Sequence, residues 1–403
     1  MNKPLEGVKV VDLTYFVAGP GTARILGDWG ADVIKVEPSF GDPGRKLGAN
    51  MTAPVIDREI NPVYTTYNAN KRGLCINLKD PEGLKIMDDL LKTANVFVSS
   101  YRTGALKRLG LDYETLHAKH PHLIWAQING FGDYGPAKDN AGFDTVAFWA
   151  RSGAMADLVE KDTSPVNPPI GFGDATTACS LSGGICAALY YQQKTGKGQK
   201  VMVSLLSQAI WSASTEMATT QYEDVYPKTR KNATSAVINS FKCKDGQWVF
   251  VSILEHERYF PVLCDLLGRP DLKNDKFLTT LEAKKNAPEL IAILDEEFIK
   301  YTQDEVVEML TKADIANERI QHFADVWKDA QALENNYVAD FKHRNGTVTK
   351  LALTPIKFEN IELNPIKDAP LIGEDSEEIL KEIGYSEETI KAYLEKGTIV
   401  VNK

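Results

Sequence analysis

An acidic residue at the end of a glycine-rich segment is the part of this sequence best suited to chemistry. Gly171-Phe172-Gly173-Asp174 follows a proline-rich stretch and precedes a run of small residues, 175–184, that is typical of a helix. Because glycine has no Cβ, a ligand can approach the carboxylate of Asp174 closely. That carboxylate could be a nucleophile. It could also cap the start of the helix, which from the local sequence alone is the commoner role.

A second glycine-containing turn imitates part of a dinucleotide-binding fingerprint. Gly19-Pro20-Gly21 follows a strand-like segment, and Glu37 ends the next one. Arg24 stands where the third glycine belongs, and Pro20 separates the first pair. A turn that needs glycine between a strand and a helix explains these residues better than NAD binding does.

No metal site is expected. His117, His120 and His122 lie close together, but Pro121 breaks the helix between them, and no carboxylate or cysteine completes a ligand set. The five cysteines are odd in number and widely spaced, which is typical of reduced thiols in a cytoplasmic protein.

The composition limits the possible partners. With 403 residues, 43% of them apolar, the chain can bury a large core and form two domains. Its net charge of −9 disfavours binding to nucleic acid or to an anionic membrane. The first residues contain no apolar signal region, and no apolar run is long enough to span a bilayer. We therefore expect a cytoplasmic location.

The elements that would position these residues follow an alternating order. Apolar runs predict strands at 8–13, 32–37, 95–98 and 123–128. Amphipathic runs predict a helix that follows the segment 17–23 and ends at about 29, and further helices from 81 onward, at 103–109 and at 112–119. This order favours an α/β fold with a parallel, doubly wound sheet.

The pattern changes after about residue 225. Runs 237–243 and 247–253 are joined by Lys244-Asp245-Gly246 and predict a hairpin, and the sequence then stays mainly helical to about residue 330. Residues 225–330 are therefore expected to form a small α+β domain. In the tail, Asp375 and Ser386 are expected to cap two short helices.

Basic residues gather near the expected strand ends of the first domain. In a doubly wound sheet such ends converge on one crevice, which would suit a phosphorylated ligand such as a nucleotide or coenzyme A (CoA). A solvated set of surface charges is an equal alternative. These residues are Arg45-Lys46, Lys71-Arg72, Arg102 and Lys107-Arg108.

Several separated motifs together resemble the class III CoA-transferases, of the formyl-CoA and carnitine CoA-transferase type. Each motif alone is weak, but their order and spacing are specific and cover nearly the whole chain. They are residues 3–12, Ala18-Gly19-Pro20, residues 30–37, Asn70-Lys71-Arg72, residues 104–110, Gly130-Phe131-Gly132 with Gly135-Pro136, residues 195–199 and residues 370–374.

The resemblance implies a fold, an assembly and a nucleophile. It implies a Rossmann-like large domain made from both chain ends, 1–224 and 331–403 with linkers, around the inserted small domain at 225–330. It also implies an interlocked homodimer. The aspartate of the family's Gly-Asp element is the nucleophile, and Asp174 matches it. Backbone N–H groups from Gly173 to Ala175 could stabilise the oxyanion.

For CoA, which the resemblance implies as a substrate and not as a permanently bound cofactor, the matching residues come from several segments. Val17 replaces a glutamine of the formyl-CoA member, and that member's glycine-rich lid is replaced here by residues 230–236. The expected CoA-binding residues are Val17, Ala18, Lys71, Arg72, Leu74, Cys75, Ser100, Tyr101 and Arg108.

For the acid, the segment 141–153 is most similar to the branch that acts on 2-hydroxy acids, such as phenyllactate or 2-hydroxyisocaproate. Phe143 and Asp144 match positions near the nucleophile, and Asp144 could orient substrate or cap the following helix. Phe148 and Trp149 could line the acyl pocket or pack beneath it. A 2-methylacyl-CoA racemase has histidine where Phe143 stands, and phenylalanine cannot accept a proton. Other acid specificities, such as carnitine, formyl or succinyl, and a non-catalytic CoA-binding role are the remaining alternatives.

Overall fold

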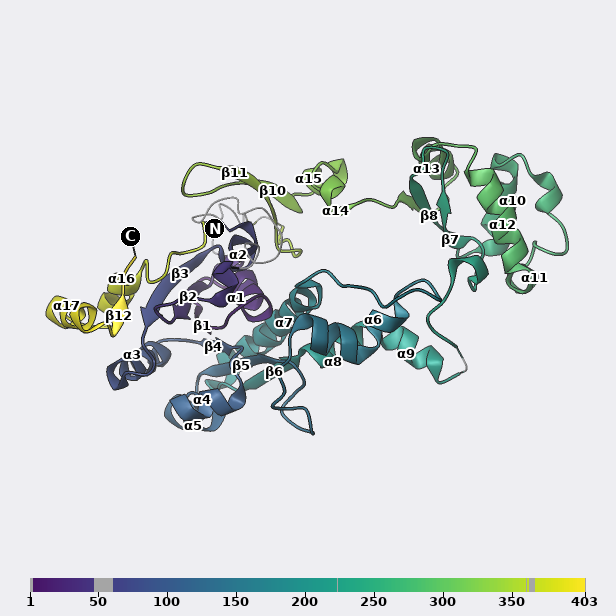
Figure 1. Ribbon diagram of the computed structural model, residues 1–403. Helices are drawn as coiled ribbons and strands as arrows, with labels where there is room; N and C mark the ends of the chain where they lie inside the picture. Colours follow the sequence, from purple (N-terminus) through teal and green to yellow (C-terminus); the bar gives the residue numbers. More distant parts are fainter. Residues whose placement is uncertain (1–2, 47–60, 223, 360, 362–366, 403) are drawn as a thin grey trace. The chain divides into compact units, whose positions relative to one another are not determined.

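The structure is a computed structural model that describes residues 3–46, 61–222, 224–359, 361 and 367–402 (Figure 1). Its contacts divide the chain into two compact units. The first unit comprises Met1–Ala154, Asn167–Met217 and Ala330–Lys403, and the second comprises Met155–Val166 and Ala218–Asp329. Residues 155–166 therefore group with the second unit, outside the predicted range of 225–330.

A seven-stranded sheet forms the centre of the first unit, in the order β12-β3-β2-β1-β4-β5-β6. All neighbouring strands are parallel except β12, which pairs antiparallel with β3. The expectation of an α/β fold with a parallel sheet is thus confirmed. The strands are β1 (Lys9–Leu13), β2 (Asp32–Glu37), β3 (Lys71–Ile76), β4 (Val96–Ser99), β5 (Ile124–Asn129), β6 (Lys200–Ser204) and β12 (Ile399–Val400).

The order of the strands reverses direction at β1. Val11 of β1 lies between Ile34 of β2 and Phe97 of β4 in the parallel register, so the chain runs outward from β1 on both sides. Ligands of doubly wound sheets bind outside the carboxyl ends of the strands at such a reversal.

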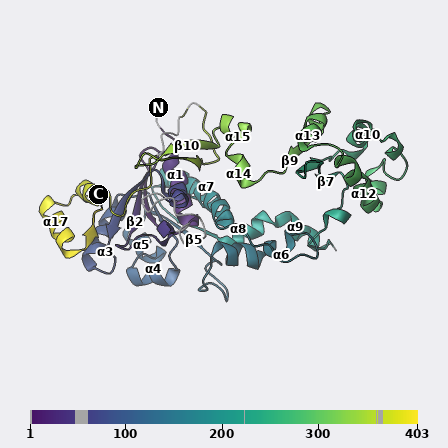
Figure 2. The same ribbon diagram turned by 45° about the horizontal axis from the view of Figure 1, so that its top comes forward.

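Helices cover both faces of this sheet. On one face α1 (Ala18–Asp28) and α7 (Phe172–Thr195) contact each other and pack on alternate strand residues such as Val10 and Val33 (Figure 2). The other face is covered by α3 (Pro81–Lys92), α4 (Thr103–Leu109), α5 (Tyr113–Lys119), α16 (Ser376–Glu382) and α17 (Glu387–Lys396). Because side chains alternate along a strand, burial on both faces makes most residues of the strands apolar, with a few buried charged exceptions such as Asp12 and Lys35.

The first unit has further elements around this core. They are η1 (Pro43–Lys46), α2 (Pro62–Asn68), the π-helix η2 (Asp144–Ala150), α8 (Leu205–Ser212), α15 (Ala330–Glu334) and a hairpin of β10 (Val338–Lys342) and β11 (Val348–Ala352). Two short helices fall at its boundary, α6 (Ala154–Asp157) and α9 (Ser214–Thr220).

The second unit has its own apolar core, which packs helices on an antiparallel sheet of order β7-β8-β9. The predicted hairpin is confirmed, since β7 pairs with β8. The elements are η3 (Arg230–Asn232), β7 (Ile238–Lys242), β8 (Trp248–Ser252), α10 (His256–Leu266), η4 (Pro270–Leu272), α11 (Thr280–Lys285), α12 (Ala287–Phe298), α13 (Gln303–Lys312), β9 (Asn317–Arg319) and α14 (Phe323–Val326).

The two predicted caps in the tail differ. Ser386 caps α17, because its hydroxyl accepts a hydrogen bond from the N–H of Thr389. Asp375 is the N-cap residue of α16, as predicted, but its side chain forms no capping hydrogen bond. Its carboxylate instead accepts the N–H of Gly73 at 2.7 Å and ties the tail to β3.

Candidate functional site

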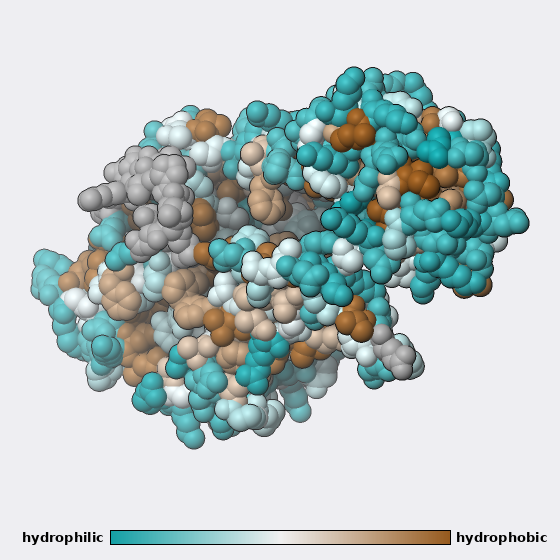
Figure 3. All heavy atoms as spheres, turned by 45° about the vertical axis from the view of Figure 1, so that its right-hand side comes forward, coloured by the Kyte–Doolittle hydropathy of each residue, from teal (hydrophilic) through white to brown (hydrophobic). Residues whose placement is uncertain are grey.

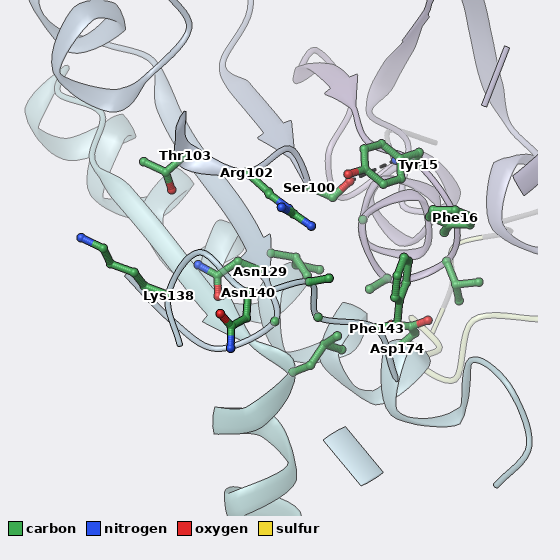
Figure 4. A pocket seen from close by; sticks show the side chains of 18 residues that line it. Tyr15, Phe16, Ser100, Arg102, Thr103, Asn129, Lys138, Asn140, Phe143 and Asp174 are labelled. Atoms are coloured by element: carbon green, nitrogen blue, oxygen red, sulfur yellow. Dashed lines mark hydrogen bonds between the residues drawn. The ribbon is translucent and has the colours of Figure 1, made fainter. Parts of the chain in front are cut away.

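A pocket opens at the carboxyl ends of β1, β4 and β5, next to the reversal in strand order. It has a volume of about 120 Å³. Figure 4 shows Arg102, Thr103 and Lys138 on one side and Phe16, Phe143 and Asp174 on the other. Its lining residues are Tyr15–Gly19, Ser100, Arg102, Thr103, Ile128–Gly130, Lys138, Asn140–Phe143, Asp174 and Leu205.

Asp174 enters the pocket from the first turn of α7. Gly171 is the N-cap residue just before the helix, and it has a left-handed backbone with φ of 84°, which favours glycine. Asp174 is the third residue of the helix and is not its cap. Its carboxylate accepts no hydrogen bond from any residue that the structure describes. Burial first, and the nearby charge of Asp144 second, raise the pKa of Asp174 to about 7.

Asp144 holds the start of α7 from a neighbouring element. This side chain is buried at the first residue of η2, and its Oδ2 accepts the N–H of Gly171 at 2.9 Å. Burial raises the pKa of Asp144, and the N–H groups of residues 171–174 partly oppose that rise. Asp144 therefore caps α7 and not its own helix, and it lies beneath the pocket lining.

Two N–H groups at the start of α7 are occupied. Gly171 donates to Asp144, and the N–H of Ala175 donates to the carbonyl oxygen of Gly171 at 2.9 Å. The N–H of Ala175 is therefore not available to an oxyanion, whereas a role for the N–H groups of Gly173 and Asp174 stays a prediction.

The turn after β1 places Phe16 in the pocket with an unusual backbone. Phe16 has φ of 68°, in the left-handed region that costs a residue with a side chain about 1–2 kcal/mol. Its N–H donates to Oδ1 of Asp42 at 3.0 Å, and Oδ2 of Asp42 lies 2.9 Å from the ammonium of Lys35. Lys35 is fully buried and also donates to the carbonyl oxygen of Thr14. This buried pair thus holds the turn from both sides.

Aromatic rings form one wall of the pocket. Phe16 packs edge to face against Phe143, with ring centroids 5.6 Å apart. Tyr15 contacts both Phe16 and Tyr101, and its N–H donates to the hydroxyl of Ser100 at 3.1 Å. Behind Tyr15 lies a second cavity, lined by Thr14, Tyr15, residues 36–38, Phe40–Pro43 and Tyr101.

Basic side chains line the opposite end of the pocket. Arg102 is the residue before the first turn of α4, and Lys138 lies in the loop that follows β5. Both side chains are exposed, and neither forms an ion pair with a carboxylate in the part of the chain described here. Such guanidinium and ammonium groups are free to bind phosphate oxygens.

The structure brings five of the predicted residues to this pocket. Asp174, Val17, Ala18, Ser100 and Phe143 line it, and the Phe143 ring is 53% exposed. Tyr101 lines the adjoining cavity.

Four other predicted residues lie in β3, away from the pocket lining. Lys71 is buried and donates to Asp12, Pro20 and Asn68 at 2.8–2.9 Å, so its ammonium is fully occupied. Burial lowers the pKa of Lys71 to about 8, although Asp12 opposes this. Arg72 pairs with Asp32 and Glu382. Leu74 and Cys75 are buried in the sheet core.

Three further predicted residues also lie outside the lining. Arg108 is exposed on α4. Phe148 and Trp149 are buried in η2, where Phe148 packs against Gly173 and Trp149 against Phe172. They therefore support the nucleophile from beneath.

Sequence reasoning missed several residues of this site. The sequence indicates Arg102 only as one of several basic residues near the strand ends. It predicts no role for Tyr15, Phe16, Lys138 and Tyr67. Tyr67 of α2 lies near both acids, since Asp174 and Asp144 contribute after burial to raising its pKa. A position directly after a strand would have indicated Tyr15 and Phe16. Neither Lys138 nor Tyr67 belongs to a recognisable motif.

The described residues contain neither a membrane-spanning helix nor a metal-ligand cluster. In that part of the chain no helix is long and apolar enough to cross a membrane. No group of three or more His, Cys, Asp or Glu side chains there could hold a metal ion.

Comparison with known proteins identifies the class. The profile of CoA-transferase family III matches residues 5–376, so the chain belongs to this family and is a class III CoA-transferase. It is 38% identical to the (R)-2-hydroxy-4-methylpentanoate CoA-transferase of Clostridioides difficile, over 98% of this chain and 99% of that protein. It is 37% identical to the cinnamoyl-CoA:phenyllactate CoA-transferase of Clostridium sporogenes, over 99% of this chain and 98% of that protein.

Solved structures support the fold. A CAIB/BAIF family protein from Brucella suis superimposes with a TM-score of 0.82 and 28% identity, covering 95% of this chain and 100% of that one. Acyl-CoA thioesters and carboxylic acids are therefore the substrates that the family implies.

Proposed function

We propose that the protein transfers CoA from an acyl-CoA or enoyl-CoA donor to a 2-hydroxy acid, through covalent intermediates on Asp174. The observation that carries this proposal is the carboxylate of Asp174, which enters the pocket without a hydrogen-bond donor and has a pKa raised to about 7. A poorly solvated carboxylate is a stronger nucleophile than one stabilised by donors.

The reaction proceeds in four exchanges at one carboxylate. Asp174 attacks the donor thioester carbonyl, its C–S bond breaks, and an aspartyl-acyl anhydride and CoA thiolate result. The thiolate attacks the aspartyl carbonyl, which releases the donor acid and leaves an aspartyl-CoA thioester. The acceptor carboxylate attacks that thioester and forms a new anhydride. The thiolate then takes the acceptor acyl group and frees Asp174.

The two ends of the pocket suggest how CoA lies. Arg102 and Lys138 would bind its phosphates, while the thioester would reach Asp174 at the other end (Figure 4). The first N–H groups of α1, at Ala18 and Gly19, border the same pocket and are candidates for oxyanion stabilisation. Arg108, on the exposed side of α4, remains a proposed contact.

The acid specificity rests on the relatives and on the aromatic wall. The acids named for the two relatives are 2-hydroxy acids with apolar side chains. Phe16 and Phe143 offer an apolar surface beside Asp174 that would accept such a side chain.

The test follows CoA from a panel of acyl-CoAs to isotope-labelled 2-hydroxy acids by mass spectrometry. We expect transfer by the native chain and loss of transfer in Asp174→Asn and Asp174→Ala. Transfer that survives Asp174→Ala would remove the nucleophile assignment. Exchange of the α-proton of the acyl-CoA without transfer would indicate racemase chemistry instead.

A further inference from the structure

Two carboxylates meet at the start of α7, although only one of them faces the pocket. Asp144 is 4% exposed, and its Oδ2 accepts the Gly171 N–H. A Cβ at Gly173 would lie 2.3 Å from Oδ1 of Asp144, so the glycine is what allows this carboxylate to approach the helix. That Oδ1 is buried and has no hydrogen-bond partner among the described residues.

The contact changes what the helix start offers to Asp174. The free N–H groups of a first turn carry partial positive charge and normally stabilise a carboxylate there. Here Asp144 receives part of that stabilisation, because it accepts the N–H of Gly171 and the backbone of residues 171–174 lowers the pKa of its carboxyl. Asp174 is left with a pocket on one side and a second acid beneath it.

No cation compensates this arrangement. The titratable group that faces the pair from α2 is the phenol of Tyr67. From the remaining packed elements of the described chain, α1, α8 and the turn after β1, no charged group acts on Asp174.

We infer that Asp144 is a positioning residue that keeps the Asp174 carboxylate reactive, by accepting the N–H of Gly171 at the helix start and by placing a second negative charge beside the nucleophile. This inference rests on the proposed role of Asp174. When the Asp174 oxygen bonds to the thioester carbon and the C–S bond breaks, the negative charge leaves with the CoA thiolate. The repulsion from Asp144 falls along that path, so the transition state is stabilised relative to the ground state. Asp144 itself gains and loses no proton.

Asp144→Asn separates the charge from the contact. The asparagine oxygen can still accept the Gly171 N–H, but the side chain is neutral. Because Asp144 raises the pKa of Asp174, its neutralisation is expected to lower that pKa. The acid limb of the kcat/KM profile for acyl-CoA, near pH 7 in the native protein, is expected to move about one unit lower. We expect the plateau rate at high pH to fall about tenfold.

Asp112→Asn is the matched control, because Asp112 also caps a helix, α5, away from the pocket. It is expected to leave the acid limb unchanged. Asp144→Ser is a second neutral variant, since serine is also a good helix cap. If either neutral Asp144 variant folds and keeps the native acid limb, the inference is overturned.

The same experiment distinguishes this inference from the proposed function. Peptide mass mapping of acyl-CoA-treated protein should find the covalent adduct on Asp174 in both native and Asp144→Asn protein, with slower formation in the variant. An adduct on Asp174 with an unshifted acid limb overturns the role of Asp144 alone. An adduct on another residue overturns the nucleophile, and this inference with it.

Discussion

At the scale of single residues, Asp174 shows how a reactive group costs stability. Its folded-state pKa of about 7 lies above the ordinary value of 3.8, so ionisation is harder in the folded protein than in the unfolded chain. Below about pH 4, Asp174 is protonated in both the folded and the unfolded chain, so folding stability is fully retained. As the pH rises to 7 this stability is lost, and above that the folded protein carries the full penalty of ionising Asp174.

Asp174→Asn is therefore expected to stabilise the protein at high pH. The neutral amide avoids the ionisation penalty, which we put at on the order of 2 kcal/mol because the pocket remains open to water. The melting temperature is expected to rise by a few degrees at pH 8 and hardly at all at pH 4.5. Thermal unfolding of both proteins at the two pH values measures this. An equal change at both pH values would mean that the charge of Asp174 is not the cause.

The basic end of the pocket gives a second prediction at this scale. Arg102→Ala and Lys138→Ala are each expected to raise KM for acyl-CoA about tenfold, the effect of about 1.4 kcal/mol, with little change in kcat. The loss would fall on binding because these residues line the side of the pocket opposite Asp174 (Figure 4). Steady-state kinetics with one acyl-CoA is sufficient.

Two other basic residues of α4 serve as comparisons for Arg102 and Lys138. Lys107 is an exposed lysine of the same helix and does not line the pocket, so Lys107→Ala is the control for a lost surface charge. Arg108→Ala tests the residue that the family resemblance favoured. A large effect of Arg108→Ala combined with none of Arg102→Ala would support that earlier assignment over the pocket geometry.

At the scale of elements, the start of α7 depends on Gly173. An added Cβ would lie 2.3 Å from both Asp144 and Phe148, so Gly173→Ala must displace either the helix or η2. Such overpacking costs about 1–3 kcal/mol. A displacement of Asp174 by about 1 Å can cost about 100-fold in rate. We expect both losses, measured by denaturant unfolding and by transfer assay.

Gly104→Ala is the control for Gly173→Ala. Gly104 lies in the first turn of α4, and a Cβ there would meet only the flexible end of Arg108, at 3.8 Å. Because alanine is the better helix former, stability is expected to stay equal or to rise by up to about 1 kcal/mol. Equal effects of the two substitutions would show that the contact at Gly173 is not special.

The sequence predicted those elements whose apolar pattern is continuous. The strand at 32–37 and the helix at 103–109 agree with β2 and α4 to the residue. β3 was missed because it begins with Lys71-Arg72-Gly73, which has the composition of a loop. It can be a central strand because Asp12 of β1 pairs with Lys71 in the interior, a partner 59 positions away that no local pattern reveals.

The dependence on contacts between distant residues also explains which residues of the site the sequence revealed. Asp174 was found because glycines and a family motif surround it. The roles of the basic residues were harder to predict, because a lysine buried in an ion pair and a lysine in a pocket look alike in sequence. Lys71 proved to be the first kind and Lys138 the second. Burial and partner geometry, which depend on the tertiary fold, separate the two.

At the scale of the whole molecule, a reversal in strand order places the site. Segments after β1, β4 and β5 reach the pocket only because the chain builds the sheet outward from β1 on both sides. With a net charge of −9, the protein as a whole repels an anionic coenzyme, so binding must depend on the local positive end of this pocket.

Exposed apolar side chains point to a partner for the first unit. The 24-residue helix α7 packs residues such as Leu181 and Ile185 into the core of the first unit. Yet Tyr190 is 60% exposed, and Trp211 of α8 is 76% exposed. On the face drawn in Figure 3, hydrophobic residues also gather in patches between hydrophilic ones. Burial of Tyr190 and Trp211 is what the homodimer implied by the family resemblance would provide.

If the two chains are threaded through one another, as the family resemblance implies, the dimer has an unusual kinetic property. Its subunits cannot separate while each is folded, so they cannot exchange. We expect dimers with two different tags, when mixed at nanomolar concentration, to form no mixed species over days, whereas co-expression of the two chains yields it. Native mass spectrometry measures both. Trp211→Glu, which places a charge on the exposed surface of α8, is expected to lower the yield of dimer during synthesis. Exchange between native dimers would indicate an ordinary, separable interface, and a monomer at all concentrations would exclude the dimer itself.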